Sequence, residues 1–352
     1  MNYKYYSFSA NRSSEDAEKV YAQRIEDATY IYNKHHQSFA PRNCPACDSG
    51  RSTRKDTFHG MYGIDQCDVC SSSFVNPAPS IDALADYYEN CLCNRQLSKI
   101  IKARYDSNDF INDERVQLIL KVVEQILQSK GADRTLKILE VGCNNGAFLS
   151  KLRQALEAAY AGEKFELYGV DIDPVAINNP VDEQLNLFHG FAEEIAKEHQ
   201  NTYDIVLHFE LIEHLINPKL FVASVHEMLG TNGKMIFTTP NFLGLDNQAL
   251  SYNGMRYLAH AIFPPMHINA FSTKNMSHFL ISNHFAVEEI ATPGKLDVDM
   301  LCQCVDYLQD ELFKDITALD EQTRALLQQL AVRMNVSSHM QCIATKIDQR
   351  NF

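Results

Sequence analysis

The sequence lacks three features that would set the protein apart from an ordinary cytosolic enzyme. No apolar run among its 352 residues approaches the roughly 20 residues of a membrane-spanning helix. The first residues, MNYKYYSFSA, lack the charged and then apolar pattern of a signal peptide. The net charge of -13 argues against a polyanionic partner such as nucleic acid. We therefore expect a cytoplasmic protein that acts on a small molecule and does not insert into a membrane.

The length and the pattern of apolar residues predict the fold class. A chain that is 45% hydrophobic and of this length can bury a substantial core, divided by the length prior into about two domains. From residue 132 onward, apolar strands alternate with amphipathic helices, which predicts an α/β fold with helices on both faces of a mainly parallel sheet. Changes in composition predict these segments: a helical arm (1–40), a cysteine-rich module (41–79), a helical connector (80–131), the α/β core (132–295), a helical insertion or lid (296–338), and the last core strand with the tail (339–352).

Four of the ten cysteines have the spacing of a metal site. Without an export signal, reduced thiols are expected. Cys44, Cys47, Cys67 and Cys70 form C-x2-C-x19-C-x2-C, in which two knuckles can close a tetrahedral thiolate site around zinc. Four thiolates leave no open coordination position, so we expect a structural zinc ion in a small module resembling a zinc ribbon. The other cysteines lack this spacing and are interpreted as packing residues.

The stretch KILEVGCNNGAFLSKL, residues 137–152, joins an apolar strand to an amphipathic helix through Gly142 and Gly146. A strand, a glycine turn and a helix N-terminus form a ligand cradle. It is not the dinucleotide fingerprint G-x-G-x-x-G, because Asn144 stands at the middle position and no third glycine follows. Glu140, at the strand end, would repel a diphosphate but suits an ammonium or a sulfonium. The predicted ligand is therefore a cationic nucleoside.

The following strands supply further candidate contacts with this ligand. Asp171 ends the next strand in LYGVDID, where an acid can accept hydrogen bonds from both ribose hydroxyls. That feature alone would fit NAD equally well. HGFAEEIA places Ala192 and Glu193 where an adenine edge could be read. Ile172, directly after the ribose acid, and His208, in the strand YDIVLHF, complete the predicted cofactor contacts.

Four motifs in this order, EVGCNNG, GVDIDP, YDIVLHFELIEHLINP and LGTNGKMIFTTPN, resemble those of class I S-adenosylmethionine-dependent methyltransferases. The resemblance covers about residues 112–292 and the final strand, MQCIATKI. It implies a Rossmann-like sheet of seven strands whose last strand inserts antiparallel, with S-adenosylmethionine as the cofactor. It also implies the division of contacts: the methionine end held by Glu140, Gly142 and Gly146, the ribose by Asp171, and the adenine by Ala192 and Glu193. Asn144 departs from the glycine usual in the family.

A cysteine module ahead of such a core is similar to two groups with different substrates. One comprises zinc-ribbon ribosomal RNA methyltransferases, the other deoxysugar C-methyltransferases of antibiotic pathways. The linker SFVNPAPSIDALADYYEN resembles the second group and related methyltransferases of surface-polysaccharide clusters. This resemblance favours a sugar or a nucleotide-linked sugar as the acceptor, and a role in carbohydrate biosynthesis. Tyr87 or Tyr88 of the linker could reach the cofactor, and the alternative is that both pack on the core.

Methyl transfer requires alignment of the acceptor and, for a hydroxyl or carbon acid, removal of its proton. His267, in PPMHINAFS, stands where sugar C-methyltransferases have a Glu-His pair followed by an aromatic residue, but Met266 replaces the acid and Phe271 supplies the ring. His267 is a candidate base for a hydroxyl, with a buried, hydrogen-bonded histidine as the alternative. His214, in ELIEHLINP, is the second candidate catalytic residue.

Two acidic segments could accompany these histidines. Glu210, Glu213 and His214 are similar to the Glu-x-x-Glu-His of some quinone-pathway O-methyltransferases, which is proposed to bind a divalent cation. If the segment is helical, Glu210 and His214 share a face, and we prefer a helix-capping network to a cation site. Asp297 and Asp299 could line the acceptor pocket, or lie on a solvated loop.

The sequence thus predicts a methyltransferase, with O-methylation as the preferred hypothesis and C-methylation as the close alternative. C-methylation would require a keto-sugar and a partner that stabilises its enolate. Three rivals are an RNA methyltransferase, with RSTRK at 51–55 as the one obvious basic cluster, a non-catalytic cofactor-binding scaffold, and an NAD-dependent reductase.

Overall fold

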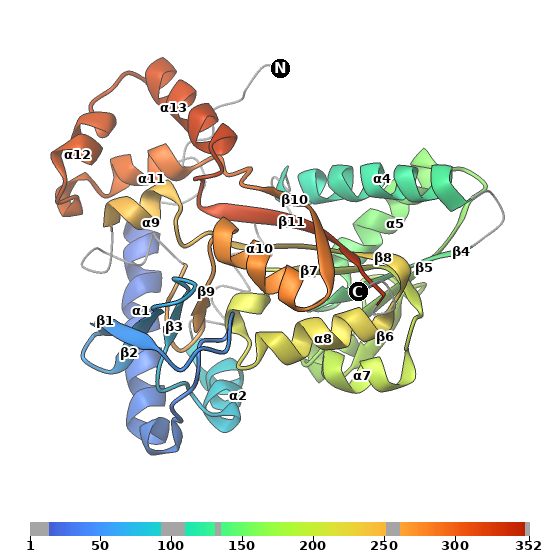
Figure 1. Cartoon of the computed structure of the whole chain (residues 1–352), viewed down its shortest axis with the longest axis horizontal. Helices are drawn as coiled ribbons and strands as arrows, with labels where there is room; N and C mark the ends of the chain where they lie inside the picture. The colour runs from blue at the N-terminus through green and yellow to red at the C-terminus, as the bar shows by residue number, and fades with distance from the viewer. Residues whose placement is uncertain (1–13, 93–109, 131–134, 251–260, 349–352) are drawn as a thin grey trace.

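A sheet of seven strands forms the centre of the protein, in the order β10-β11-β8-β7-β4-β5-β6 (Figure 1). The computed structural model describes residues 14–92, 110–130, 135–250 and 261–348. Parts of the predicted arm, connector, core and tail (1–13, 93–109, 131–134, 251–260 and 349–352) lie outside these ranges. The strands of the sheet are β4 (Thr135–Val141), β5 (Lys164–Asp171), β6 (Asn186–His189), β7 (Tyr203–Phe209), β8 (Leu229–Pro240), β10 (Phe285–Ala291) and β11 (His339–Lys346).

The strand directions confirm the predicted α/β architecture. β4 pairs parallel with β5 and β7, β5 with β6, and β7 with β8, whereas β11 inserts antiparallel between β8 and β10. The carboxyl ends of the parallel strands therefore meet at one edge, where ligands bind in open α/β sheets. Because β11 runs the opposite way, its first residue, His339, reaches the same edge and pairs with Pro240.

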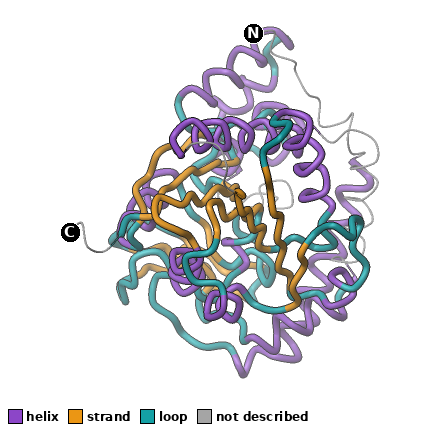
Figure 2. The backbone as a smooth tube through the Cα atoms, turned by 90° about the vertical axis from the view of Figure 1, so that its right-hand side faces the viewer, coloured by secondary structure: helices purple, strands orange, loops and turns teal. Residues whose placement is uncertain are grey.

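Helices cover both faces of the sheet, as Figure 2 shows from the side. α4 (Phe110–Lys130) and α5 (Ala147–Ala159) pack on one face, and α7 (Ala192–Glu198), α8 (Pro218–Met228) and α10 (Thr273–Ser282) on the other. The short helix α6 (Pro174–Ile177) follows β5. Side chains alternate along each strand, so Ile205 and Leu207 join the α4 and α5 cluster whereas Val206 joins the α8 cluster. No helix in the described ranges is both long and apolar enough to cross a bilayer.

The N-terminal part forms a lobe beside this core (Figure 1). It contains α1 (Ser14–His35), the 3-10 helix η1 (His36–Ser38), β1 (Ser52–Phe58), β2 (Tyr62–Cys67), β3 (Ser73–Val75) and α2 (Ile81–Asn90). Its sheet is antiparallel, in the order β1-β2-β3-β9. The last strand, β9 (Asn269–Ala270), comes from the core part of the chain, between β8 and α10. Ala28 of α1 is fully buried and packs with Tyr62 and Ile268. The lobe is therefore joined to the core by a shared sheet, and α1 packs on it.

A helical cluster precedes β11, in the segment predicted as an insertion or lid. It comprises α11 (Asp297–Gln303), the 3-10 helix η3 (Val305–Tyr307), α12 (Glu311–Thr317) and α13 (Glu321–Arg333), and α9 (Leu245–Leu250), from the predicted core, packs against α11. Asp297 is 2% exposed and accepts hydrogen bonds from the hydroxyls of Ser337 and Ser338, and Asp299 is 7% exposed. The expectation of a solvated loop at these aspartates is therefore wrong. Asp297 anchors α11 to the residues that directly precede β11.

Candidate active site

The loop between β4 and α5 adopts the left-handed conformation at three positions. Gly142, Asn144 and Gly146 have φ values of 79°, 50° and 81°. Asparagine is among the few residues other than glycine that adopt this conformation readily, which explains how Asn144 replaces the usual glycine. At Gly146 a side chain is excluded sterically as well, because a Cβ would lie 2.6 Å from Cδ1 of Leu185. The loop keeps its backbone close to the start of α5.

Asp171, at the end of β5, is tied to this loop. Its Oδ2 accepts the backbone N–H of Asn144 at 2.7 Å and its Oδ1 accepts that of Asp173 at 2.9 Å. A carboxylate oxygen can accept more than one hydrogen bond, so each oxygen can still take a ligand hydroxyl. The predicted ribose acid is thus held in place from two sides.

Glu140 is buried at the end of β4 with one unsatisfied oxygen. The residue is 5% exposed, and its Oε2 has no hydrogen-bond partner among the described residues. Burial raises the pKa of Glu140 to about 8, which Arg115 opposes and Asp171 reinforces. An unpaired buried carboxylate is costly unless a partner arrives. The site therefore fits a ligand that brings a cationic group to this position, such as an amino acid ammonium.

Arg115 of α4 is a residue that the sequence reasoning missed. Its guanidinium lies 4.3 Å from the centre of the Phe209 ring, donates to Oγ1 of Thr238 at 3.1 Å, and lies 3.5 Å from Oε1 of Glu210. Its Nε is buried without a hydrogen-bond partner among the described residues. Arg115 therefore places a positive charge at the sheet edge, close enough to Glu140 to lower the pKa of that carboxyl. Helical periodicity alone could not assign it to this edge.

The candidate adenine contacts lie along β5, β6 and the start of α7. Asp171 and His189 are neighbours on β5 and β6, and the N–H of Gly190 donates to the Asp171 carbonyl at 3.0 Å. Ala192 is 4% exposed and begins α7, with Glu193 partly buried beside it. Ile172 and Phe191, 50% and 53% exposed, add apolar surface to this part of the edge. Phe191 had not been predicted.

His208 does not lie where the predicted cofactor contact requires. Its ring is 0% exposed, stacks on Phe237 with 4.5 Å between ring centres, and meets Phe221 edge-on at 5.1 Å. Burial lowers the pKa of His208 to about 3, so the ring is neutral. The side chain belongs to the core under α8. The prediction that His208 contacts the cofactor is therefore wrong.

The two candidate catalytic histidines, separated by 53 residues in sequence, lie together. The His214 and His267 rings meet edge-on with 4.6 Å between their centres. Oη of Tyr88, on α2, lies 3.0 Å from Nδ1 of His214, whereas Tyr87 is 2% exposed in the core. Leu211, three residues before His214, contacts the position where Gly142 would carry a Cβ, at 3.7 Å. Leu211 therefore brings the start of the His214 turn to the glycine loop, and Tyr88 is the tyrosine of the pair that reaches His214.

Glu213 contributes an acid to this cluster. It is 1% exposed, its Oε2 accepts the Thr239 hydroxyl at 2.9 Å, and its Oε1 lies 3.8 Å from Nε2 of His214. Burial raises the pKa of Glu213 to about 8, and burial lowers that of His214 to about 4. The ligand atoms of Glu213, His214 and His267 lie within 4.8 Å of one another. This arrangement can pass a proton between carboxyl and imidazole, or hold a divalent cation.

Glu210 does not share a face with His214, because the segment is not an α-helix there. Glu210 has a φ of 51°, and only Ile212–His214 (η2) form a 3-10 turn. The Glu210 carboxylate instead accepts from Thr238 at 2.6 Å and lies 3.0 Å from Nε2 of His339. The charge of Glu210 raises the pKa of His339 to about 9. The acidic partner of the two histidines is thus Glu213, without Glu210.

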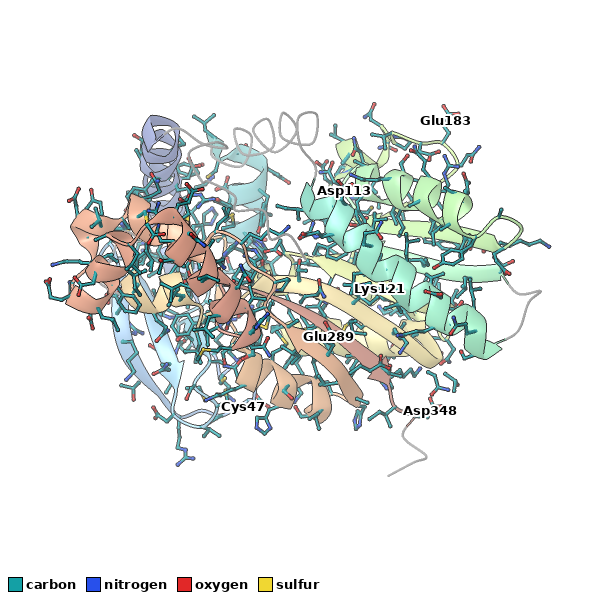
Figure 3. The ribbon with its side chains drawn as sticks, turned by 90° about the horizontal axis from the view of Figure 1, so that it is seen from above. Cys47, Asp113, Lys121, Glu183, Glu289 and Asp348 are labelled. Carbon is teal, nitrogen blue, oxygen red and sulfur yellow. The ribbon has the colours of Figure 1, made fainter. Side chains whose placement is uncertain are left out.

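The four predicted zinc ligands converge in the N-terminal lobe. The sulfurs of Cys44 and Cys70 lie 3.5 Å apart, as do those of Cys47 and Cys67, and all four lie within 4.8 Å of one another. A zinc ion with Zn–S bonds of about 2.3 Å would separate tetrahedral sulfurs by about 3.8 Å. The cluster therefore has the dimensions of a structural zinc site. Figure 3 labels Cys47 in the N-terminal lobe. Glu183, between α6 and β6, lies on the opposite side of the same view.

Comparisons with known proteins point to one family. The methyltransferase domain family matches residues 111–290, close to the extent of the resemblance seen in the sequence. A ubiquinone biosynthesis O-methyltransferase of Photobacterium profundum is 32% identical over 111 residues, which are 30% of this chain and 44% of that protein. The same enzyme of Coxiella burnetii is 29% identical over 127 residues, 35% of this chain and 49% of that protein. The chain thus spans less than half of the length of these curated relatives.

The solved structures that the chain matches are more distant in sequence. A SAM dependent methyltransferase from Archaeoglobus fulgidus is 16% identical with a TM-score of 0.40, covering 68% of this chain and 100% of that one. An S-adenosylmethionine dependent methyltransferase from Mesorhizobium loti is 14% identical with a TM-score of 0.39, covering 60% and 91%.

Proposed function

Because the chain belongs to the methyltransferase domain family, we propose that it transfers the methyl group of S-adenosylmethionine to a small polar acceptor. The observation that carries this proposal is the unsatisfied Glu140 carboxylate at the end of β4, beside the Gly142 loop and Asp171. The ammonium of a methionine-type ligand would pair with the ionised form of Glu140, and the ribose hydroxyls would donate to the Asp171 oxygens. The bound cofactor supplies an already activated methyl group, and the protein supplies alignment and acceptance of a proton.

The proposed acceptor is a sugar or a nucleotide-linked sugar, methylated on oxygen in the cytoplasm. The resemblance of the linker to sugar methyltransferases supports a sugar as the acceptor. The curated O-methyltransferases favour oxygen as the methylated atom. In this proposal His267 takes the hydroxyl proton as the methyl group arrives. His214 lies against the His267 ring and is oriented by Tyr88, and Glu213 is the acid beside the pair. The overall acidity of the chain opposes the RNA alternative.

C-methylation of a keto-sugar is a second candidate, favoured by one observation. The position before His267 holds Met266 in place of the acid of sugar C-methyltransferases, so the sequence offers no local carboxyl. Glu213 brings a carboxyl within 4.8 Å of His267 from a different segment. A protonated Glu213, favoured by its raised pKa of about 8, could donate a hydrogen bond to an enolate oxygen. Screening matched hydroxy- and keto-sugar nucleotides would separate the two reactions.

Calorimetric titration with S-adenosylhomocysteine tests the cofactor assignment, with NADH as the control ligand. We expect micromolar binding of the nucleoside and none of NADH. Asp171→Ala should weaken the binding by about 1.5 to 3 kcal/mol, because hydrogen bonds to a charged group are lost. Glu183→Ala, a change of an exposed acid beyond β5 (Figure 3), should leave it unchanged. Binding of NADH, or equal affinity in the two variants, would count against the assignment.

His267→Ala tests the chemical step. We expect methyl transfer to an acceptor found among nucleotide sugars to slow by about 100-fold or more, the usual contribution of a general base. The affinity for S-adenosylhomocysteine should stay within about twofold, because His267 is placed with the acceptor. The measurement is initial-rate kinetics beside calorimetry on the same protein. Normal turnover would transfer the role of base to His214.

The cysteine cluster is proposed to hold a structural zinc ion. Its four thiols fit the preference of zinc for tetrahedral sulfur, and all four positions would be filled by protein. The ion would hold the loops that precede β1 and β3 together. It would take no part in methyl transfer.

A further inference from the structure

Arg42 connects three separate segments of the backbone. Its Nε donates to the carbonyl of Val75 at 3.0 Å, one terminal nitrogen donates to that of Ile216 at 3.3 Å, and the other to that of Ile268 at 2.7 Å. Its side chain also lies over the Phe74 ring, 5.5 Å from the ring centre. Ile216 follows His214 by two residues, and Ile268 directly follows His267. One guanidinium therefore holds both histidine segments to the N-terminal lobe.

The two histidine segments are also bound to each other through β9. The N–H of Ile268 donates to the carbonyl of Glu213 at 2.9 Å. The side chain amide of Asn269 donates to the carbonyls of Ile212 and Leu215, at 3.1 and 2.7 Å. These bonds fix the spacing between His214 and His267 once β9 is in place. The position of β9 in turn depends on its pairing with β3, where Val75 donates its N–H to Ile268 at 2.9 Å.

The same arginine is close to the cysteine cluster in the chain. Arg42 precedes Cys44 by two residues, and the Cys44 sulfur lies 3.5 Å from that of Cys70. On the other side of the cluster, the Asn275 amide of α10 donates to the Cys70 carbonyl at 3.4 Å. A displacement of the Cys44 loop would therefore move Arg42. The hydrogen bonds from Arg42 to the Ile216 and Ile268 carbonyls would then shift both histidine segments.

We propose that Arg42 is a positioning residue for the acceptor site, and that it makes the spacing of His214 and His267 depend on a closed cysteine cluster. This inference rests on the proposed function, because it gives the two histidines a role in methyl transfer. Only arginine can donate to three separate carbonyls in this way, since its planar guanidinium donates in fixed directions from three nitrogens, whereas lysine offers a single nitrogen. The N-terminal lobe is then part of the active site's framework.

The test compares Arg42→Gln and Arg42→Lys with Arg54→Gln. Arg54 is a matched control, because the side-chain hydrogen bonds that it donates to described residues stay within the lobe, at the Asp65 carboxylate and the Asn76 carbonyl. The readout is carbon-13 NMR of labelled histidine rings from pH 4 to 8, with the two signals assigned by His214→Gln and His267→Gln. In both Arg42 variants we expect both signals to shift, and His214 to begin titrating near the ordinary histidine value of about 6.5. Arg54→Gln should retain the wild-type spectrum.

Two further observations keep the outcome decisive. Removing the metal from the unmodified protein with a chelator should produce the same two shifts as Arg42→Gln. If Arg42→Gln does not fold, Arg42→Lys, which keeps the charge, decides the question. Unchanged histidine signals and titrations in a folded Arg42 variant would overturn the proposal. Failure of the unmodified protein to bind S-adenosylhomocysteine would instead refute the proposed function, and the NMR result would still report on the positions of the two rings.

Discussion

Glu140→Gln is expected to abolish a pH dependence of cofactor binding that the unmodified protein shows below about pH 8. Burial raises the pKa of Glu140 to about 8, so the free protein carries a neutral carboxyl at lower pH. Pairing with the ligand ammonium requires the ionised form, and binding must then release a proton. The affinity for S-adenosylhomocysteine should therefore rise up to tenfold per pH unit and level off above about pH 8. Between pH 6 and 8 this amounts to about 100-fold, or about 2.7 kcal/mol.

Calorimetry in two buffers of different ionisation enthalpy measures both the affinity and the protons released. The matched control is Glu213→Gln, because burial also raises the pKa of Glu213 to about 8 but the residue lies with the acceptor histidines. This variant should keep the full pH dependence, whereas Glu140→Gln should bind weakly and equally at every pH. If Glu140→Gln retained the slope and Glu213→Gln lost it, the ammonium would have to be assigned to Glu213.

The edge that carries the candidate cofactor residues could be predicted because its determinants are local. Glycines at 142 and 146 interrupt two runs of clear periodicity, and parallel strands bring their carboxyl ends to one edge wherever they lie in the sequence. Asp171 and Glu140 both stand at such ends. Sequence alone was therefore sufficient to place them at the same edge of the sheet.

The proposed acceptor site depends on contacts that no local pattern encodes. His267 meets His214 because β9 pairs with β3, which comes from the N-terminal lobe. Arg115 enters from α4, and His339 enters only because β11 runs antiparallel to its neighbours. Each of these placements requires the tertiary fold, and the polar cluster they form could not be assembled from spacing.

His208 shows how one residue of register decides a contact. Along β7, Leu207 faces α4 and α5, and the next side chain must face the opposite helices. His208 therefore enters the space between Phe221 and Phe237, and Phe209 is the residue of this strand that lies under Arg115 at the edge. The motif located the strand correctly, but it did not determine which face carried the imidazole.

Cys47→Ser is expected to remove a tightly bound zinc ion and to destabilise the N-terminal lobe. Cys47 is exposed, so the substitution leaves no cavity, and its effect reports the lost metal ligand. Binding to a structural zinc site is worth about 10 to 16 kcal/mol in isolated peptides, and that free energy is available to folding. We expect a loss of at least about 3 kcal/mol in stability, at the upper end of single substitutions. The measurements are elemental analysis and thermal unfolding, with Cys302→Ser, outside the cluster, as the control.

The alternative to a zinc ion at the four cysteines is a pair of disulfide bonds. Bonded sulfurs lie about 2.05 Å apart, whereas Cys44 and Cys70, like Cys47 and Cys67, lie 3.5 Å apart. Two disulfides would draw the sulfurs into two bonded pairs, whereas a single ion would gather all four sulfurs around it, which agrees with their lying within 4.8 Å of one another. Purified protein with no metal, and with a mass lower by the hydrogens of two disulfides, would refute the zinc site. Arg42 precedes Cys44 by two residues. The histidine NMR spectrum of this oxidised protein would therefore show whether disulfide formation, in place of metal binding, controls the spacing of His214 and His267.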